Sequence, residues 1–77
     1  MDDIDRNSLV PVYVQLAAIL RDRIESGAIG RGQVLPSKRQ LRGEFGVSGE
    51  TCDKAIGLLR AEGRLVTVRG KGHYVKP

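Results

Sequence analysis

The sequence predicts a mainly α-helical fold that ends in a small β-hairpin. Three segments place apolar residues three and four positions apart, which is the period of a helix with one buried face. The last fifteen residues instead alternate apolar and polar side chains around a glycine-rich break, which is typical of two paired strands. A chain of 77 residues has room for one small domain with one core. We therefore expect three helices followed by one hairpin.

The first predicted helix runs from about residue 12 to residue 26. Its apolar stripe consists of Tyr13, Leu16, Ala17, Leu20 and Ile24. Pro11 suits the first turn, and Gly27 suits the end, where a left-handed residue is often needed. Residues 1–10 are polar and acidic without such a period, so we expect a flexible acidic tail there and a single folded domain over residues 11–77.

The second predicted helix is short and starts at Ser37. The Ser37 side chain can cap the helix, and Gln40 can bond back to the cap amide. Pro36 and Leu41 are spaced to pack across that start, and Gly46 is expected to end the helix. The glycine-rich loop before it has at most a short extended piece at residues 34 and 35.

The third predicted helix, over residues 48–61, follows a very short connection. Gly46 can take a positive φ, Val47 is expected to be buried, and Ser48 can cap the new helix. The apolar stripe of this helix consists of Cys52, Ala55, Ile56 and Leu59. Two helices joined in this way form a helix-turn-helix, whose second helix has the shape to enter the major groove of B-DNA.

The predicted hairpin has a basic tip. The apolar-polar alternation begins at Leu65 and resumes at His73, and the break between them is Gly70-Lys71-Gly72. This break lacks the glycine spacing and the following Ser or Thr of a phosphate-binding loop, and it joins strands rather than opening a helix. A basic tip of this kind can enter the minor groove beside the helix.

The charge balance points to a polyanionic partner. The net charge is +4, but all 13 Lys and Arg lie after residue 5, against six of the 9 acids, which leaves +7 for that part. The three aromatic residues, Tyr13, Phe45 and Tyr74, offer few platforms for stacking single-stranded bases. Duplex nucleic acid is therefore the leading expected partner.

Several other function classes find no support in the sequence. The single Cys52 and single His73 cannot form a disulfide framework or a zinc site, so we expect a core thiol and a phosphate-contacting or solvated histidine. No motif suggests an enzyme, a cofactor or a metal. No apolar stretch is long enough for a membrane span, and the acidic amino end is unlike a secretory signal, so we expect a soluble cytoplasmic protein.

A set of residues spread over positions 11–76 also forms a recognisable pattern. They are Pro11, Tyr13, Gln15, Gly27, Leu35, Pro36, Ser37, Arg39, Leu41, Gly46, Val47, Ser48, Thr51, Ala55, Leu59, Glu62, Gly63, Gly70, Gly72 and Val75. In type and spacing they resemble the winged helix-turn-helix DNA-binding domain of the GntR family of bacterial transcription regulators. The resemblance implies operator binding, with repression of transcription as the usual outcome.

The resemblance also implies which residues contact DNA. Arg39 would contact the DNA from the start of the second helix. Ser48 and Thr51 would contact phosphate, and the wing tip (residues 69–72) would enter the minor groove. The alternatives are a plain surface arginine, a helix cap and a solvated turn. The expected DNA contacts are Ser37, Lys38, Arg39, Ser48, Gly49, Glu50, Thr51, Asp53, Lys54, Arg69, Gly70 and Lys71.

Some positions depart from the family pattern. Gly49 stands where members commonly carry Arg, so a base-reading guanidinium is missing, and Glu50 and Asp53 put two acids on the reading helix. Lys54 can pair with Glu50 across one helical turn. Gly43 lies inside the second helix, where glycine costs about 0.5 to 1 kcal/mol relative to alanine. We therefore expect an unusual operator and a weak second helix.

Two other partners and two assembly states stay open at this point. A winged helix with acids on its reading helix could dock a partner protein instead of DNA, and structured RNA is a third alternative. GntR-type regulators usually carry a further domain that binds an effector and dimerises. The chain is thus either a fragment or a free-standing domain, with a homodimer expected on a palindromic site and no small-molecule effector site within it.

Overall fold

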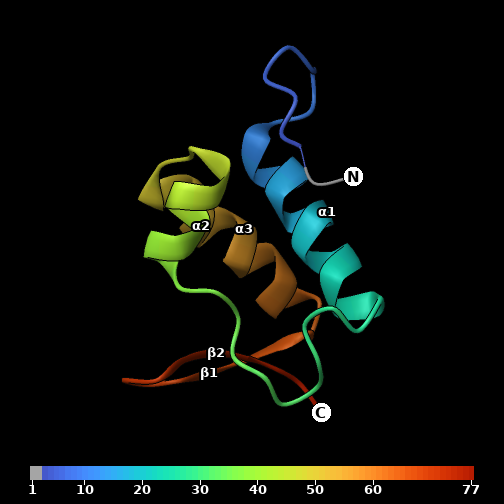
Figure 1. Cartoon of the computed structure of the whole chain (residues 1–77), viewed down its shortest axis with the longest axis vertical. Coiled ribbons are helices and arrows are strands. Elements are labelled where there is room, and N and C mark those ends of the chain that lie inside the picture. The colour runs from blue at the N-terminus through green and yellow to red at the C-terminus, as the bar shows by residue number, and fades with distance from the viewer. Residues whose placement is uncertain (1–2) are drawn as a thin grey trace.

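The computed structural model describes residues 3–77 and contains three helices and one hairpin (Figure 1). The elements are α1 (Val12–Glu25), α2 (Lys38–Phe45), α3 (Gly49–Ala61), β1 (Leu65–Val68) and β2 (Gly72–Val75). Their order confirms the predicted fold class, and each helix boundary lies close to the expected one. This arrangement is a winged helix-turn-helix.

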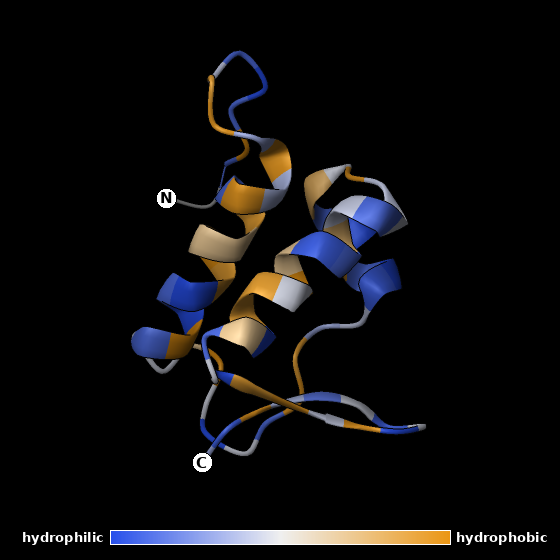
Figure 2. Ribbon diagram, turned by 180° about the vertical axis from the view of Figure 1, so that it is seen from behind, coloured by the Kyte–Doolittle hydropathy of each residue, from blue (hydrophilic) through white to orange (hydrophobic). Residues whose placement is uncertain are grey.

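The core lies where α3 packs against α1, α2 and β1. Its largest fully buried side chains are Leu16, Leu20, Leu41, Leu59 and Cys52. Burying one leucine contributes roughly 1.5 to 3 kcal/mol, so this cluster is a main source of stability. Leu65 and Val75 at the base of the hairpin belong to the same cluster and fix the hairpin to the helices. In Figure 2, α2 is largely hydrophilic, whereas α1 and α3 carry most of the hydrophobic colour.

The two helix starts of the helix-turn-helix are capped as the sequence predicts. Ser37 Oγ accepts from the Gln40 amide at 3.1 Å, and Gln40 Oε1 accepts from the Ser37 amide at 2.9 Å, which completes the capping box. Ser48 Oγ accepts from the Thr51 amide at 3.1 Å. Between them Gly46 takes a φ of 64°, which allows the chain to leave α2 and enter α3 directly.

The hairpin carries a short third segment along its edge. β1 and β2 pair antiparallel, with Leu65 opposite Val75 and Val68 opposite Gly72. The loop before α2 joins them because the Leu35 amide donates to the His73 carbonyl at 2.7 Å. The expected extended piece at residues 34 and 35 is therefore present, and it ties the wing to the start of α2.

Residues 3–10, which the sequence predicts to be a flexible tail, make contacts with the rest of the chain. The Asp5 amide donates to Gln15 Oε1 at 2.8 Å, and Arg6 Nη2 donates to the carbonyls of Phe45 at 3.1 Å and Gly46 at 2.8 Å. Ile4 packs against the core. The segment thus fastens the start of α1 to the turn between α2 and α3. Residues 1 and 2 lie outside the described residues, and the flexibility of the tail stays a prediction.

Three further features of residues 3–77 concern membranes, metal ions and the single thiol. No helix within residues 3–77 is both long and apolar enough to cross a membrane. Across the same range, no three His, Cys, Asp or Glu side chains gather closely enough to hold a metal ion. The Cys52 thiol is buried in the core stripe as predicted, and this burial raises the pKa of the thiol.

Candidate nucleic-acid interface

The start of α2, the first half of α3 and the hairpin meet around one hollow. This cavity of about 470 Å³ is lined by Val34, Leu35, Pro36, Ser37, Lys38, Gln40, Asp53, Ile56, Lys71, Gly72 and His73. Figure 1 shows α2 and the hairpin tip extending to the same side of the molecule, away from α1. Four of the expected DNA contacts, Ser37, Lys38, Asp53 and Lys71, are therefore brought together from three elements.

All of the expected contact residues reach the surface. Gly49 and Thr51 are half-buried, and the other ten are exposed. Lys38 and Arg39 occupy the first turn of α2, Glu50, Asp53 and Lys54 follow the exposed side of α3, and residues 69–71 form the turn at the wing tip. We call the exposed part of α3 that holds Gly49, Glu50, Asp53 and Lys54 the reading face.

The serine hydroxyls at the two helix starts already have partners within the chain. The Ser48 hydroxyl caps α3 and donates to the Thr51 hydroxyl at 3.0 Å. The capping role of Ser48 is confirmed, while its contact with phosphate stays a prediction. The same applies to Ser37 at the start of α2, whose hydroxyl is part of the capping box.

Each acid on the reading face is paired with a lysine. The expected pair is present, with Lys54 Nζ 3.4 Å from Glu50 Oε1. A second pair, which the sequence analysis missed, joins Lys38 Nζ to Asp53 Oδ1 at 3.1 Å. Lys54 Nζ also lies 5.7 Å from the centre of the Tyr13 ring on α1. Exposed pairs contribute at most about 1 kcal/mol each, but they offset the negative charge that the acids would present to phosphates.

A second group of cations has no acidic partner among residues 3–77. Arg39 and Arg42 on α2 and Arg69 and Lys71 at the wing tip are exposed, and no ion pair within the described residues involves them. Arg42 was absent from the expected contacts. It lies three residues after Arg39 on the same side of α2. Of these four, Arg42 lies beside Gly49, with its Cδ 4.0 Å from a Cβ atom built there, and Lys71 lines the same cavity as Asp53.

His73 stands at the edge of the same cavity. Its Nδ1 lies 2.9 Å from the Thr67 hydroxyl on the opposite strand, and its side chain is half-buried. This cross-strand hydrogen bond holds the imidazole on the hairpin, and His73 and Lys71 both line the cavity between the wing and the start of α2. A phosphate contact for His73 stays a prediction.

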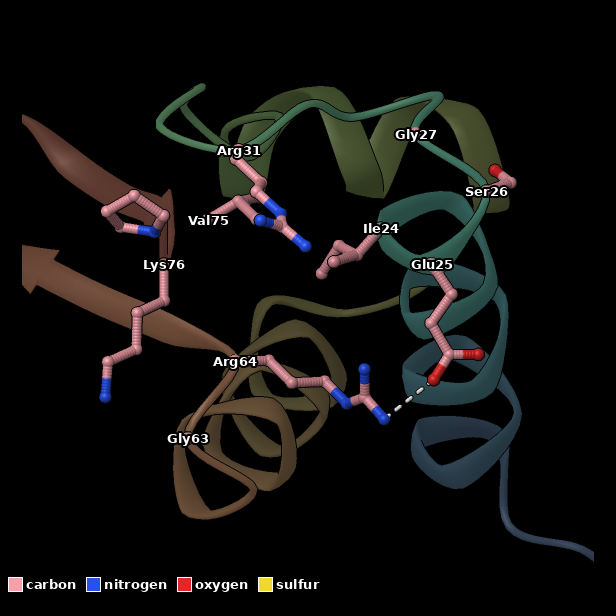
Figure 3. Close-up of a pocket in the computed structure, with 10 residues that line it drawn as sticks. Ile24, Glu25, Ser26, Gly27, Arg31, Gly63, Arg64, Val75 and Lys76 are labelled. Atoms are coloured by element: carbon pink, nitrogen blue, oxygen red, sulfur yellow. Dashed lines mark ion pairs between the residues drawn. The ribbon is translucent and has the colours of Figure 1, made fainter.

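The far ends of α1 and α3 form a separate polar region. Arg21 Nη2 lies 2.5 Å from Glu62 Oε2, Arg64 Nε lies 2.8 Å from Glu62 Oε1, and Arg64 also pairs with Glu25. Because two guanidinium groups donate to it, the Glu62 carboxylate has a pKa lowered to about 2. Figure 3 shows the Glu25–Arg64 pair beside a cavity of about 560 Å³, into which Arg31 also points. The described lining of this cavity includes none of the expected DNA contacts.

The fold and the interface define a class of protein. A tight helix-turn-helix whose second helix exposes one face, with a basic hairpin beside it, is the arrangement of a winged helix-turn-helix nucleic-acid-binding domain. A sequence model of the gntR family of bacterial regulatory proteins matches residues 12–75. The chain belongs to this family, which confirms the resemblance found in the sequence.

Individual relatives agree with this assignment. The chain is similar to the HTH-type transcriptional repressor NagR of Bacillus subtilis, with 33% identity over 95% of the chain and 30% of NagR. YtrA from Sulfolobus acidocaldarius, a GntR-family transcription factor, superposes with a TM-score of 0.87 at 36% identity, covering 97% of this chain and 79% of YtrA. The AraR DNA-binding domain in complex with operator ORX1 gives a TM-score of 0.84 at 36% identity, covering 92% and 88%. The chain therefore corresponds to less than a third of NagR.

Proposed function

We propose that this chain binds duplex DNA at a specific operator as the DNA-binding part of a transcription repressor. In this proposal α3 lies in the major groove and the wing tip lies in the adjacent minor groove. The observation that carries it is that α2 and the wing, which meet the reading face of α3 at one cavity, carry four exposed cations without an acidic partner among residues 3–77. Two relatives support it: the operator complex of the AraR domain and the name of NagR as a repressor.

The residues divide between holding the backbone and reading bases. Arg39 and Arg42 on α2 would contact phosphates on one side of the major groove, because a guanidinium can donate two parallel hydrogen bonds to a phosphate. The first amide groups of α3 and the Thr51 hydroxyl add uncharged donors at the start of the reading helix. Lys71 would enter the minor groove, where Gly70 allows the backbone of the tip to approach closely.

The charge pairing on the reading face bears on the alternative partners. A protein-docking role was suggested by two acids that would repel phosphates. Because Lys54 lies beside Glu50 and Lys38 lies beside Asp53, the reading face is close to neutral and that argument loses most of its force. The other alternative partner is structured RNA. A competition experiment between duplex DNA and structured RNA shows which of the two the protein binds more tightly.

We also propose the wider setting of this activity. Two copies would bind a palindromic operator, since helix-turn-helix domains commonly bind paired half-sites. Any small-molecule effector would be sensed by residues outside this chain, and the regulator would act in the cytoplasm, where bacterial DNA is found. The dimer is tested by measuring the mass of the complex in solution, once with a duplex that contains one half-site and once with a duplex that contains two.

The salt dependence of binding tests the electrostatic part of the proposal. If about four to six phosphates are contacted, the logarithm of the association constant should fall against the logarithm of salt concentration with a slope near −4 to −5. Fluorescence anisotropy with a labelled duplex gives this slope. Arg31→Ala serves as the control, because it removes an exposed cation that lines the other cavity, and it should leave the slope unchanged. Affinity that does not change with salt would contradict the proposal.

A further inference from the structure

The pair between Lys38 and Asp53 joins the start of α2 to the second turn of α3. Lys38 Nζ lies 3.1 Å from Asp53 Oδ1 and 3.3 Å from Oδ2, so the ammonium contacts both carboxylate oxygens. The Asp53 side chain nevertheless stays 62% exposed and the Lys38 side chain 51% exposed. The carboxylate is thus held in position while its remaining lone pairs stay accessible.

Gly49 lies directly beneath the Lys38 side chain of this pair. A Cβ atom at Gly49 would lie 3.4 Å from Lys38 Cδ, 3.9 Å from Lys38 Cε and 4.0 Å from Arg42 Cδ. The stem of Lys38 therefore lies across the first residue of α3, where a longer side chain would otherwise project. Asp53 comes four residues after Gly49 on the same face of the helix. Because Gly49 has no side chain, Asp53 is the first residue on this line along α3 whose side chain extends from the helix.

The chemistry of a held carboxylate restricts what it can recognise. An ionised carboxylate only accepts hydrogen bonds, and the donors in the major groove are the amino groups of cytosine and adenine. Acidic side chains are typically paired with the N4 amino group of cytosine. A lone carboxylate would be repelled by the phosphates, but the ammonium of Lys38 offsets that repulsion at the cavity where the wing and α2 meet.

We infer that Asp53 is a specificity-determining residue that accepts a hydrogen bond from the N4 amino group of a cytosine in the operator. Lys38 acts as the positioning residue, and its side chain packs over Gly49. This inference rests on the proposed DNA-binding function and adds a defined base preference to it. The competing explanation is that Asp53 is only a counter-ion for Lys38, whose ammonium binds phosphate.

The two explanations predict opposite results for Asp53→Ala. A duplex selected from a random pool by the unaltered chain should contain one cytosine whose replacement by thymine weakens binding about tenfold or more. Asp53→Ala should abolish that difference, whereas Asp22→Ala, a control that removes an exposed acid on α1, should keep it. Circular dichroism confirms that each variant is folded. Retention of the cytosine preference by Asp53→Ala, with tighter binding to all duplexes, would overturn the inference in favour of the counter-ion.

A charge exchange supplies a second test that keeps the ion pair. In the double variant Lys38→Asp with Asp53→Lys, an ammonium replaces the carboxylate on α3, and lysine binds guanine O6 and N7. The preference at that position should change from cytosine to guanine. An unchanged preference would overturn the inference. If the unaltered chain binds duplexes without the cytosine preference, only this inference fails, and if it binds no duplex at low salt, the proposed function fails as well.

Discussion

Replacing Gly43 with alanine should stabilise the domain. Gly43 is exposed in the interior of α2, and a Cβ atom built there has no neighbour within 4 Å. Its backbone is helical, so alanine fits without strain and reduces the freedom of the unfolded chain. The expected gain is about 0.5 to 1 kcal/mol in the free energy of unfolding. For a domain of this size, that gain raises the melting temperature by about 3 to 6 °C.

Two other glycines provide comparison variants for Gly43→Ala. Gly57 in α3 also has open space around it, so Gly57→Ala should give a similar gain. Gly46 has a φ of 64°, where alanine is strained, so Gly46→Ala should lower stability by about 1 kcal/mol or more. Thermal unfolding followed by circular dichroism, with urea titration as a second measure, compares the three variants. If the Gly43→Ala domain melts at or below the temperature of the unaltered domain, Gly43 does not destabilise α2.

Three further predictions concern binding, the amino-terminal segment and pH. Arg39→Ala should weaken binding to all duplexes alike and make the salt slope less negative by about 1, and a loss confined to one sequence would contradict a phosphate contact. Arg6→Ala removes two hydrogen bonds to the Phe45 and Gly46 carbonyls and should destabilise the domain by about 1 kcal/mol in urea titration, whereas a freely mobile tail predicts no change. The lowered pKa of Glu62, about 2 instead of 4.5, means that its ion pairs stabilise the fold above pH 4.5 and lose this effect as the pH falls toward 2. Thermal unfolding at pH 7 and pH 2.5 should therefore show a smaller acid-induced loss for Glu62→Gln than for the unaltered chain, and an equal loss would refute the assignment.

Features set by local sequence were predicted well. Ser37 and Ser48 mark both helix starts because a capping hydroxyl acts within three residues, and Gly46 marks the turn because only a residue tolerant of positive φ fits there. The Glu50–Lys54 pair was also predictable, since residues four apart on a helix are neighbours. In each case the deciding contact is close in sequence.

Features that depend on contacts between distant residues were missed. Arg6 reaches the Gly46 carbonyl across 40 positions, and Lys38 reaches Asp53 across 15. Neither interaction leaves a period or a motif in the sequence, because each depends on how the helices pack. Gly49 shows the same limit. The sequence indicated only a missing arginine, while the structure shows that the Lys38 side chain occupies the space beside it.

Base reading by α3 can be measured as the difference in affinity of the domain for a selected duplex and for a scrambled duplex of the same composition, at one fixed salt concentration. If α3 reads bases while the flanking cations hold phosphates, the selected duplex should bind at least about 10³-fold more tightly. Equal affinity for the two duplexes would contradict base reading by α3, even if both bound well.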